Sequence, residues 1–222
     1  MLEDLKQEVC EIAQLAQRSG LCKHKSGNFS ARDPLTGLIV ITPTGVDRER
    51  LKPSDMIVMN QKREIIENLS SLKPTSEFLT HMMIYERKED TKAIVHTHSL
   101  YATTIAVLNR AIPALVYEMS TLGVTKGRIP IAPYGRPGSR MLAENIREAC
   151  MESETFLLEK HGVIAYDKNS TYEAYLKAAY VEELAQIYFH VLLADKEHSI
   201  KPFDQAELER WSYPDEISSG SN

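Results

Sequence analysis

Short apolar runs typical of buried strands alternate with helical segments along this sequence, and the alternation constrains the fold more than any other feature. The strand-like runs occupy residues 37–45, 55–68, 93–98 and 155–167. Apolar residues at helical spacing mark residues 2–20, 75–88, 99–110, 137–152 and 170–191. A central sheet covered by helices buries both kinds of apolar face, so we predict an α/β sandwich. The order and direction of the strands stay open.

The chain length of 222 residues allows one domain or two. No internal repeat, low-complexity block or linker precedes residue 196, so we predict a single domain over residues 1–195. Residues 196–222 then form a C-terminal segment, and its polar ending, SSGSN, predicts partial disorder.

Charge and cysteine content exclude several classes of protein. A formal net charge of −5 argues against a nucleic-acid-binding protein with a broad basic face. The acidic, amphipathic N-terminus does not resemble a signal peptide, and no apolar run approaches the ~20 residues that span a bilayer. Three cysteines without a CxxC pair are typical of a reducing compartment. We therefore expect a cytoplasmic protein without membrane or nucleic-acid partners.

Two histidines, His96 and His98, end the apolar run of residues 93–98. Side chains two apart in a strand share a face, so both imidazoles point the same way. An isolated pair fits metal binding or two satisfied polar residues equally well. Neighbouring residues disfavour three metal folds: no glutamate follows as in cupins, position 100 is Leu rather than the Asp of metallo-β-lactamases, and the chain is short for a TIM-barrel hydrolase.

The chain offers two further ligand candidates, His161 in the predicted turn EKHG and Glu77 at a predicted helix start. Three imidazoles and a carboxylate would form a metal site with a position open to substrate. His81 lies four residues after Glu77 on the same helix face and either holds Glu77 in place or is a core histidine. His190 on the long helix fits a structural role better.

Three short segments carry small residues and donors of the kind that bind phosphate: Thr75–Ser76 at a helix start, Ser26–Gly27–Asn28, and Thr44–Gly45. Each segment alone is explained better as a helix cap or an ordinary turn than as a phosphate site. Lys25 beside them fits a surface position better than a phosphate contact. The sequence contains no Walker A, GxSxG or Rossmann motif, so nothing calls for a nucleotide.

Seven segments in order, spanning about residues 5–195, resemble the class II aldolase/adducin family. They are SGNFSARD, VITPTG, PTSEFLTHMMIY, AIVHTHSLYAT, IPALVYE, IAPYGRPGS and LLEKHGVIAYD. The resemblance implies a three-layer α/β/α sandwich with a mixed sheet, a metal-dependent aldolase domain and a homotetramer. It implies one divalent ion per subunit, Mn²⁺ or Zn²⁺.

The resemblance also implies roles for individual residues. His96, His98, His161 and Glu77 would be metal ligands, with Glu77 also a catalytic base. Tyr117, Glu118 and Tyr213 would act in catalysis, Tyr213 by reaching a neighbouring subunit. The substrate phosphate would be bound by Asn28, Thr44, Gly45, Thr75 and Ser76.

The implied reaction is the cleavage of a ketose 1-phosphate, such as 5-deoxyribulose 1-phosphate or fuculose 1-phosphate, to dihydroxyacetone phosphate and an aldehyde. Glu118 raises a second possibility, because dehydratases of methylthioribulose 1-phosphate in the family carry a glutamate nearby. A ribulose-5-phosphate 4-epimerase and a non-enzymatic adducin-like module are further alternatives. The Thr-Ser-Glu run at residues 75–77 is the aldolase-like form, so we rank the aldolase first.

Overall fold

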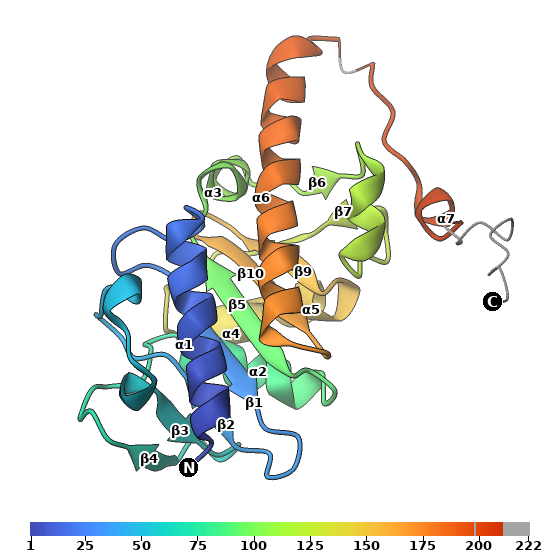
Figure 1. The fold of residues 1–222 in the computed structure, drawn as a ribbon. Helices are drawn as coiled ribbons and strands as arrows, with labels where there is room; N and C mark the ends of the chain where they lie inside the picture. Colours follow the sequence, from blue (N-terminus) through green and yellow to red (C-terminus); the bar gives the residue numbers. More distant parts are fainter. Residues whose placement is uncertain (198, 211–222) are drawn as a thin grey trace, which may run out of the picture.

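The computed structural model describes residues 1–197 and 199–210, and its centre is an eight-stranded sheet (Figure 1). The strand order is β4-β3-β2-β1-β5-β10-β9-β8. All neighbours are antiparallel except β8 and β9, which are parallel, so the predicted mixed sheet is confirmed. The strands are β1 Asn28–Arg32, β2 Ile39–Ile41, β3 Ile57–Met59, β4 Ile65–Asn68, β5 Ala93–Thr97, β8 Ile131–Ala132, β9 Thr155–Leu158 and β10 Gly162–Asp167.

Helices cover both faces of this sheet, which confirms the three-layer sandwich (Figure 1). On one face α1 (Glu3–Arg18) and α6 (Thr171–Ala194) pack against the strand residues that include Phe29, Val95 and Ala165. On the other face α2 (Phe78–Arg87), α4 (Arg140–Asn145) and α5 (Arg147–Glu152) pack against Ile94, Phe156 and Ile164. Alternate residues of each central strand therefore enter different cores.

A smaller unit adjoins the sheet beside α6. It contains α3 (Leu100–Val107), the two-stranded sheet of β6 (Ile112–Pro113) and β7 (Arg128–Ile129), and the 3-10 helix η3 (Tyr117–Thr121). The chain beyond α6 returns to this unit, where the Phe203 N–H donates to the Ala114 carbonyl at 2.8 Å. Leu208 of α7 (Gln205–Leu208) is buried there. The predicted disorder at the chain end and Tyr213 lie outside the described residues.

Several elements differ from the sequence prediction, among them the two-residue strands β6, β7 and β8, which were not predicted. Strand β1 was not predicted, yet it lies at the centre of the sheet between β2 and β5. The single helix predicted over residues 137–152 is wrong, because the backbone tightens at Ile146 (φ −78°, ψ −8°) and divides it into α4 and α5. The bend lets buried side chains of both helices reach the same core cluster. None of the helices described in the structure is long and apolar enough to cross a membrane.

Candidate metal centre

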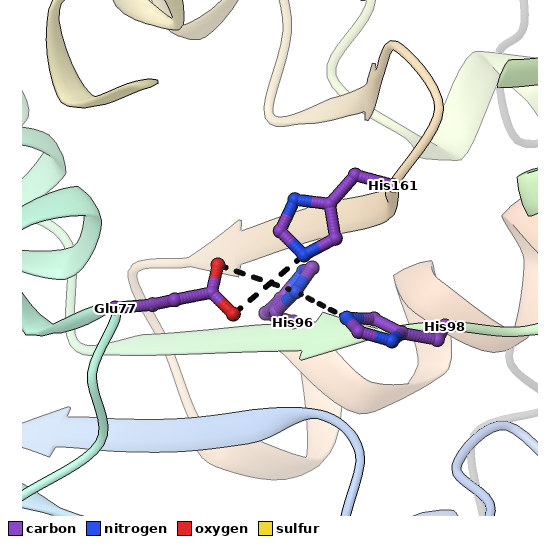
Figure 2. A group of neighbouring side chains, drawn as sticks. All are labelled: Glu77, His96, His98 and His161. Atoms are coloured by element: carbon purple, nitrogen blue, oxygen red, sulfur yellow. Dashed lines mark hydrogen bonds and ion pairs between the residues drawn. The ribbon is translucent and has the colours of Figure 1, made fainter. Parts of the chain in front are cut away.

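Four side chains from three separate parts of the chain meet at one end of the central strands (Figure 2). Glu77 is the residue immediately before α2, His96 lies in β5, His98 follows β5, and His161 lies in the turn between β9 and β10. One possible ligand atom from each lies within 4.8 Å of all the others. The structure therefore brings together the four residues that the sequence proposed as metal ligands.

The distances between these atoms suit a single small cation. The Glu77 carboxylate oxygens lie 3.6 Å from His96 Nε2 and 3.6 Å from His161 Nε2, and the Nε2 atoms of His96 and His98 are 2.9 Å apart. Each pair of the three imidazole rings has centroids 4.8 Å apart. Ligands about 2.1 Å from a tetrahedral ion are about 3.4 Å from one another. A divalent ion at the centre of the cluster therefore fits these residues.

The hydrogen bonding of the cluster also fits a cation. His96 Nδ1 donates to the Val163 carbonyl at 2.9 Å, so its Nε2 carries the lone pair that faces the cluster. Within the described part of the chain, Glu77 Oε2 and both ring nitrogens of His161 are buried without a hydrogen-bond partner. Buried polar atoms without partners are costly, and a metal ion would satisfy Glu77 Oε2 and one of the two ring nitrogens of His161.

Burial and neighbouring charges set the protonation states of the cluster. Burial lowers the pKa of His96 to about 3 and that of His98 to about 4. Burial raises the pKa of Glu77, but the adjacent His96 and His161 outweigh it, so the pKa falls to about 2. Neutral imidazoles and an ionised carboxylate are the forms that bind metal.

A chain of buried hydrogen bonds leads to Glu77 from the interior of the α2 face. Asn28 Nδ2 donates to Glu77 Oε1 at 3.4 Å, and Asn28 Oδ1 accepts from His81 Nε2 at 2.6 Å. His81 Nδ1 must then accept from Ser30 Oγ at 2.7 Å, and Ser30 accepts from the Tyr85 hydroxyl at 2.9 Å. All donors point towards Glu77. His81 therefore acts on Glu77 through Asn28 rather than by direct contact.

Ser30, Tyr85 and the bridging position of Asn28 were not predicted from the sequence, because strand β1 was not predicted. The signal was present in the alternation of Asn28, Ser30 and Arg32 with Phe29 and Ala31, which is the period of a strand. Asn28 lies directly opposite His96 in the sheet, on the face covered by α2.

The three predicted phosphate segments are also neighbours. Residues 43 and 74 form an isolated bridge, in which the Thr44 N–H donates to Lys73 and the Thr75 N–H donates to Thr42. Thr75 is buried and its hydroxyl accepts from the Glu77 N–H at 3.3 Å. Thr44, Gly45 and Ser76 are exposed. Phosphate donors and the metal cluster would therefore share the start of α2.

The remaining candidates lie apart from the cluster in this chain. Tyr117 and Glu118 belong to η3 and line a cavity of about 450 Å³ together with Leu208. Among the described residues, no hydrogen bond or ring contact joins Tyr117 or Glu118 to the metal cluster. The Tyr117 ring instead contacts Phe203, with centroids 6.4 Å apart. Lys25 and His190 are exposed.

Gly162 allows the turn that carries His161 to approach β5. A Cβ atom at this position would overlap the Thr97 carbonyl oxygen and lie 3.1 Å from His98 Cδ2. Any larger residue would therefore move the turn and separate His161 from His98.

Known proteins are similar to this chain in both sequence and fold. Residues 7–189 match the family model described as class II aldolase and adducin N-terminal domain. The chain is 35% identical to a 5-deoxy-D-ribulose 1-phosphate aldolase of Bacillus thuringiensis, over 85% of this chain and 86% of that protein. It is 34% identical to an L-fuculose phosphate aldolase of Escherichia coli, over 85% and 84% of the two chains.

A solved structure of an L-fuculose 1-phosphate aldolase superposes with a TM-score of 0.84 and 31% identity, covering 93% of each chain. Sequence and fold agree over nearly the whole length of the protein. The chain therefore belongs to the class II aldolase and adducin family.

Proposed function

We propose that the protein is a divalent-metal-dependent lyase that cleaves a ketose 1-phosphate to dihydroxyacetone phosphate and an aldehyde. The observation that carries this proposal is the cluster of Glu77, His96, His98 and His161 in a chain whose relatives are aldolases. We propose 5-deoxyribulose 1-phosphate or fuculose 1-phosphate as the substrate, because the matched relatives are named for these two compounds.

The three histidines and Glu77 would hold the ion, Mn²⁺ or Zn²⁺, since imidazole and carboxylate ligands suit either metal. When bound, the ion acts as a Lewis acid that stabilises the negative charge developing beside the ketone as the carbon–carbon bond breaks. The Glu77 carboxylate would exchange a proton with the carbon that carries this charge. Asn28 would orient that carboxylate, because it donates to Glu77 Oε1.

The substrate phosphate would lie over the three joined segments that contain Asn28, Thr44–Gly45 and Thr75–Ser76. Two observations support this position of the phosphate. The Pro43–Pro74 bridge joins two of the segments, and Thr75 and Ser76 lie at the start of α2. The aldehyde end of the substrate would require an acid for its oxygen. We propose Tyr117 and Tyr213 for this role, with Tyr213 supplied to a neighbouring subunit of a homotetramer.

We propose that residues 1–195 form the catalytic domain, that residues 196–222 are the C-terminal segment, and that the protein acts in the cytoplasm. The free, buried cysteines Cys10, Cys22 and Cys150 support a reducing compartment. The relatives named as aldolases favour this function over the dehydratase, the epimerase and the adducin-like module.

The first experiment is an assay of 5-deoxyribulose 1-phosphate with and without a chelator, with all products followed by mass spectrometry. We expect chelator-sensitive release of dihydroxyacetone phosphate. Loss of water without carbon–carbon cleavage would refute the aldolase function. It would instead indicate a dehydratase in which Glu118 is the catalytic residue. Fuculose 1-phosphate in the same assay distinguishes the two substrate candidates.

A further inference from the structure

A buried arginine, Arg48, lies beneath two of the proposed phosphate segments. Arg48, in the 3-10 helix η1 (Arg48–Arg50), is 2% exposed. Its guanidinium has five N–H donors, and each one has a backbone carbonyl acceptor. The acceptors are Ser26 at 3.3 Å from Nε, Pro43 at 3.3 Å and Val46 at 3.0 Å from Nη1, and Lys25 at 3.0 Å and Gly27 at 2.5 Å from Nη2.

These five carbonyls belong to the two loops that contain the proposed phosphate donors. Asn28 directly follows the first loop, and Thr44 and Gly45 lie inside the second. The second loop is joined to Thr75 by the Pro43–Pro74 bridge. Arg48 thus completes a connected set of three segments. The N–H groups of Gly45 and Ser76 donate to no acceptor among the described residues, which leaves them available to an anion.

The charge of Arg48 is not paired with a carboxylate. No described acidic group lies within ion-pair distance of it, although Asp47 is its neighbour in the chain. Burial therefore lowers the pKa of Arg48. Of the other buried cationic side chains, Lys177 contacts Asp167 and Lys6 contacts Glu67, whereas Arg32, like Arg48, has no carboxylate partner among the described residues. An unpaired buried charge is costly, and a phosphate dianion nearby would offset that cost.

A second buried arginine, Arg32, differs from Arg48 in where its carbonyl acceptors lie. Arg32, at the opposite end of β1 from Asn28, also donates to backbone carbonyls, including Tyr85 at 3.3 Å and Lys88 at 3.4 Å. These carbonyls end α2, where the helix dipole favours a cation. The carbonyls around Arg48 do not end a helix; they belong to the loops beside the metal cluster.

We propose that Arg48 is a positioning residue of the phosphate subsite, where it clamps the two donor loops and supplies an unpaired positive charge. This inference rests on the proposed sugar-phosphate function. All five donors are occupied, so Arg48 acts through the loops and through its field rather than by direct contact. The substrate phosphate lies away from the reacting carbons. Weaker phosphate binding should therefore reduce substrate affinity more than turnover.

The test compares Arg48→Met, Arg48→Lys and the control Arg32→Met in the metal-loaded protein. Binding of inorganic phosphate is measured by calorimetry, together with metal content and the KM and kcat for dihydroxyacetone phosphate in the condensation direction. Arg48→Met should raise the Kd for phosphate and the KM about tenfold, with kcat within about threefold. Arg48→Lys, which keeps the charge but has at most three donors, should lie between Arg48→Met and wild type.

Unchanged phosphate binding in folded, metal-loaded Arg48→Met would overturn the proposal, as would an equal effect of Arg32→Met. If Arg48→Met does not fold, Arg48→Lys decides by the same criterion. A wild-type protein that does not bind phosphate also overturns it. A wild-type protein that binds phosphate through Arg48 but has no aldolase activity would refute the proposed function and leave the subsite supported.

Discussion

His81 Nε2 lies 2.6 Å from Asn28 Oδ1, and both side chains are buried beneath the metal cluster. The amide oxygen can only accept, so the imidazole must donate, and the Asn28 amide nitrogen is thereby turned towards Glu77. This relationship sets the orientation of the proposed catalytic carboxylate from a residue that does not touch it.

Two substitutions of His81 test this orientation. In His81→Gln the amide nitrogen can take the place of Nε2 and still donate to Asn28, whereas the shorter side chain of His81→Asn reaches only the Nδ1 position. We expect kcat to be at least about tenfold lower in His81→Asn than in His81→Gln. This factor corresponds to the loss of one hydrogen bond to a charged group, here the bond from Asn28 to the Glu77 carboxylate. Metal content should match in the two proteins. Equal kcat values would show that the donor is not required.

Loss of a metal ligand should abolish turnover without unfolding the protein. We expect a chelator, Glu77→Gln and His96→Ala each to lower kcat by about a hundredfold or more, because charge stabilisation and proton transfer are both lost. Elemental analysis and circular dichroism separate loss of metal from loss of fold. The exposed His190→Ala is the matched control and should behave like the wild type. Near wild-type activity in either ligand variant would refute the role given to that residue.

Acid should destabilise the metal-free protein through His81. Burial lowers its pKa to about 4 from an ordinary value of 6.5, so the unfolded chain binds a proton at a higher pH than the folded chain does. The free energy of unfolding should therefore fall as pH drops below about 6.5, with His81 contributing about 3 kcal/mol by pH 4. In urea denaturation, the free energy of unfolding of His81→Gln should depend less steeply on pH than that of the wild type, by the equivalent of up to one bound proton.

The buried ion pair of Lys177 should matter more for stability than an exposed one. Lys177 Nζ lies 2.6 Å from Asp167 Oδ2 and also contacts Glu154, between α6 and the sheet. Lys177→Met would leave the Asp167 carboxylate buried and unpaired, at a cost of about 3–5 kcal/mol. Lys126→Met breaks a surface pair with Glu152 and should cost less than about 1 kcal/mol. Denaturant unfolding of both variants measures the difference, and equal losses would contradict it.

The approach of the His161 turn to β5 should depend on Gly162. In Gly162→Ala the methyl group would overlap the Thr97 carbonyl, so metal affinity should fall at least about tenfold. Gly20→Ala is the control, because its Cβ meets nothing within 4 Å and its positive φ of 82° costs only local stability. Metal titration of the two variants checks this. Wild-type affinity in folded Gly162→Ala would show that the turn can move without separating the ligands.

The amino-acid sequence by itself determined the layered α/β class and the identity of the ligand candidates. Apolar spacing identified the helix over residues 2–20 and the strand that contains His96, because these segments bury one face or both and their patterns are local. The same approach missed β1, whose polar residues Asn28, Ser30 and Arg32 made it look like a loop. Their burial depends on partners about fifty residues away, which no local pattern contains.

Tertiary structure alone decided how these residues act on one another. Glu77, His96 and His161 come from separate elements, and only the pairing of β5 with β10 and the packing of α2 bring them within 4.8 Å. The direction of the hydrogen bonds from Tyr85 to Glu77 and the five carbonyls around Arg48 are likewise products of packing. A sequence specifies which groups are present, whereas their distances, burial and pKa values arise from contacts between segments distant along the chain.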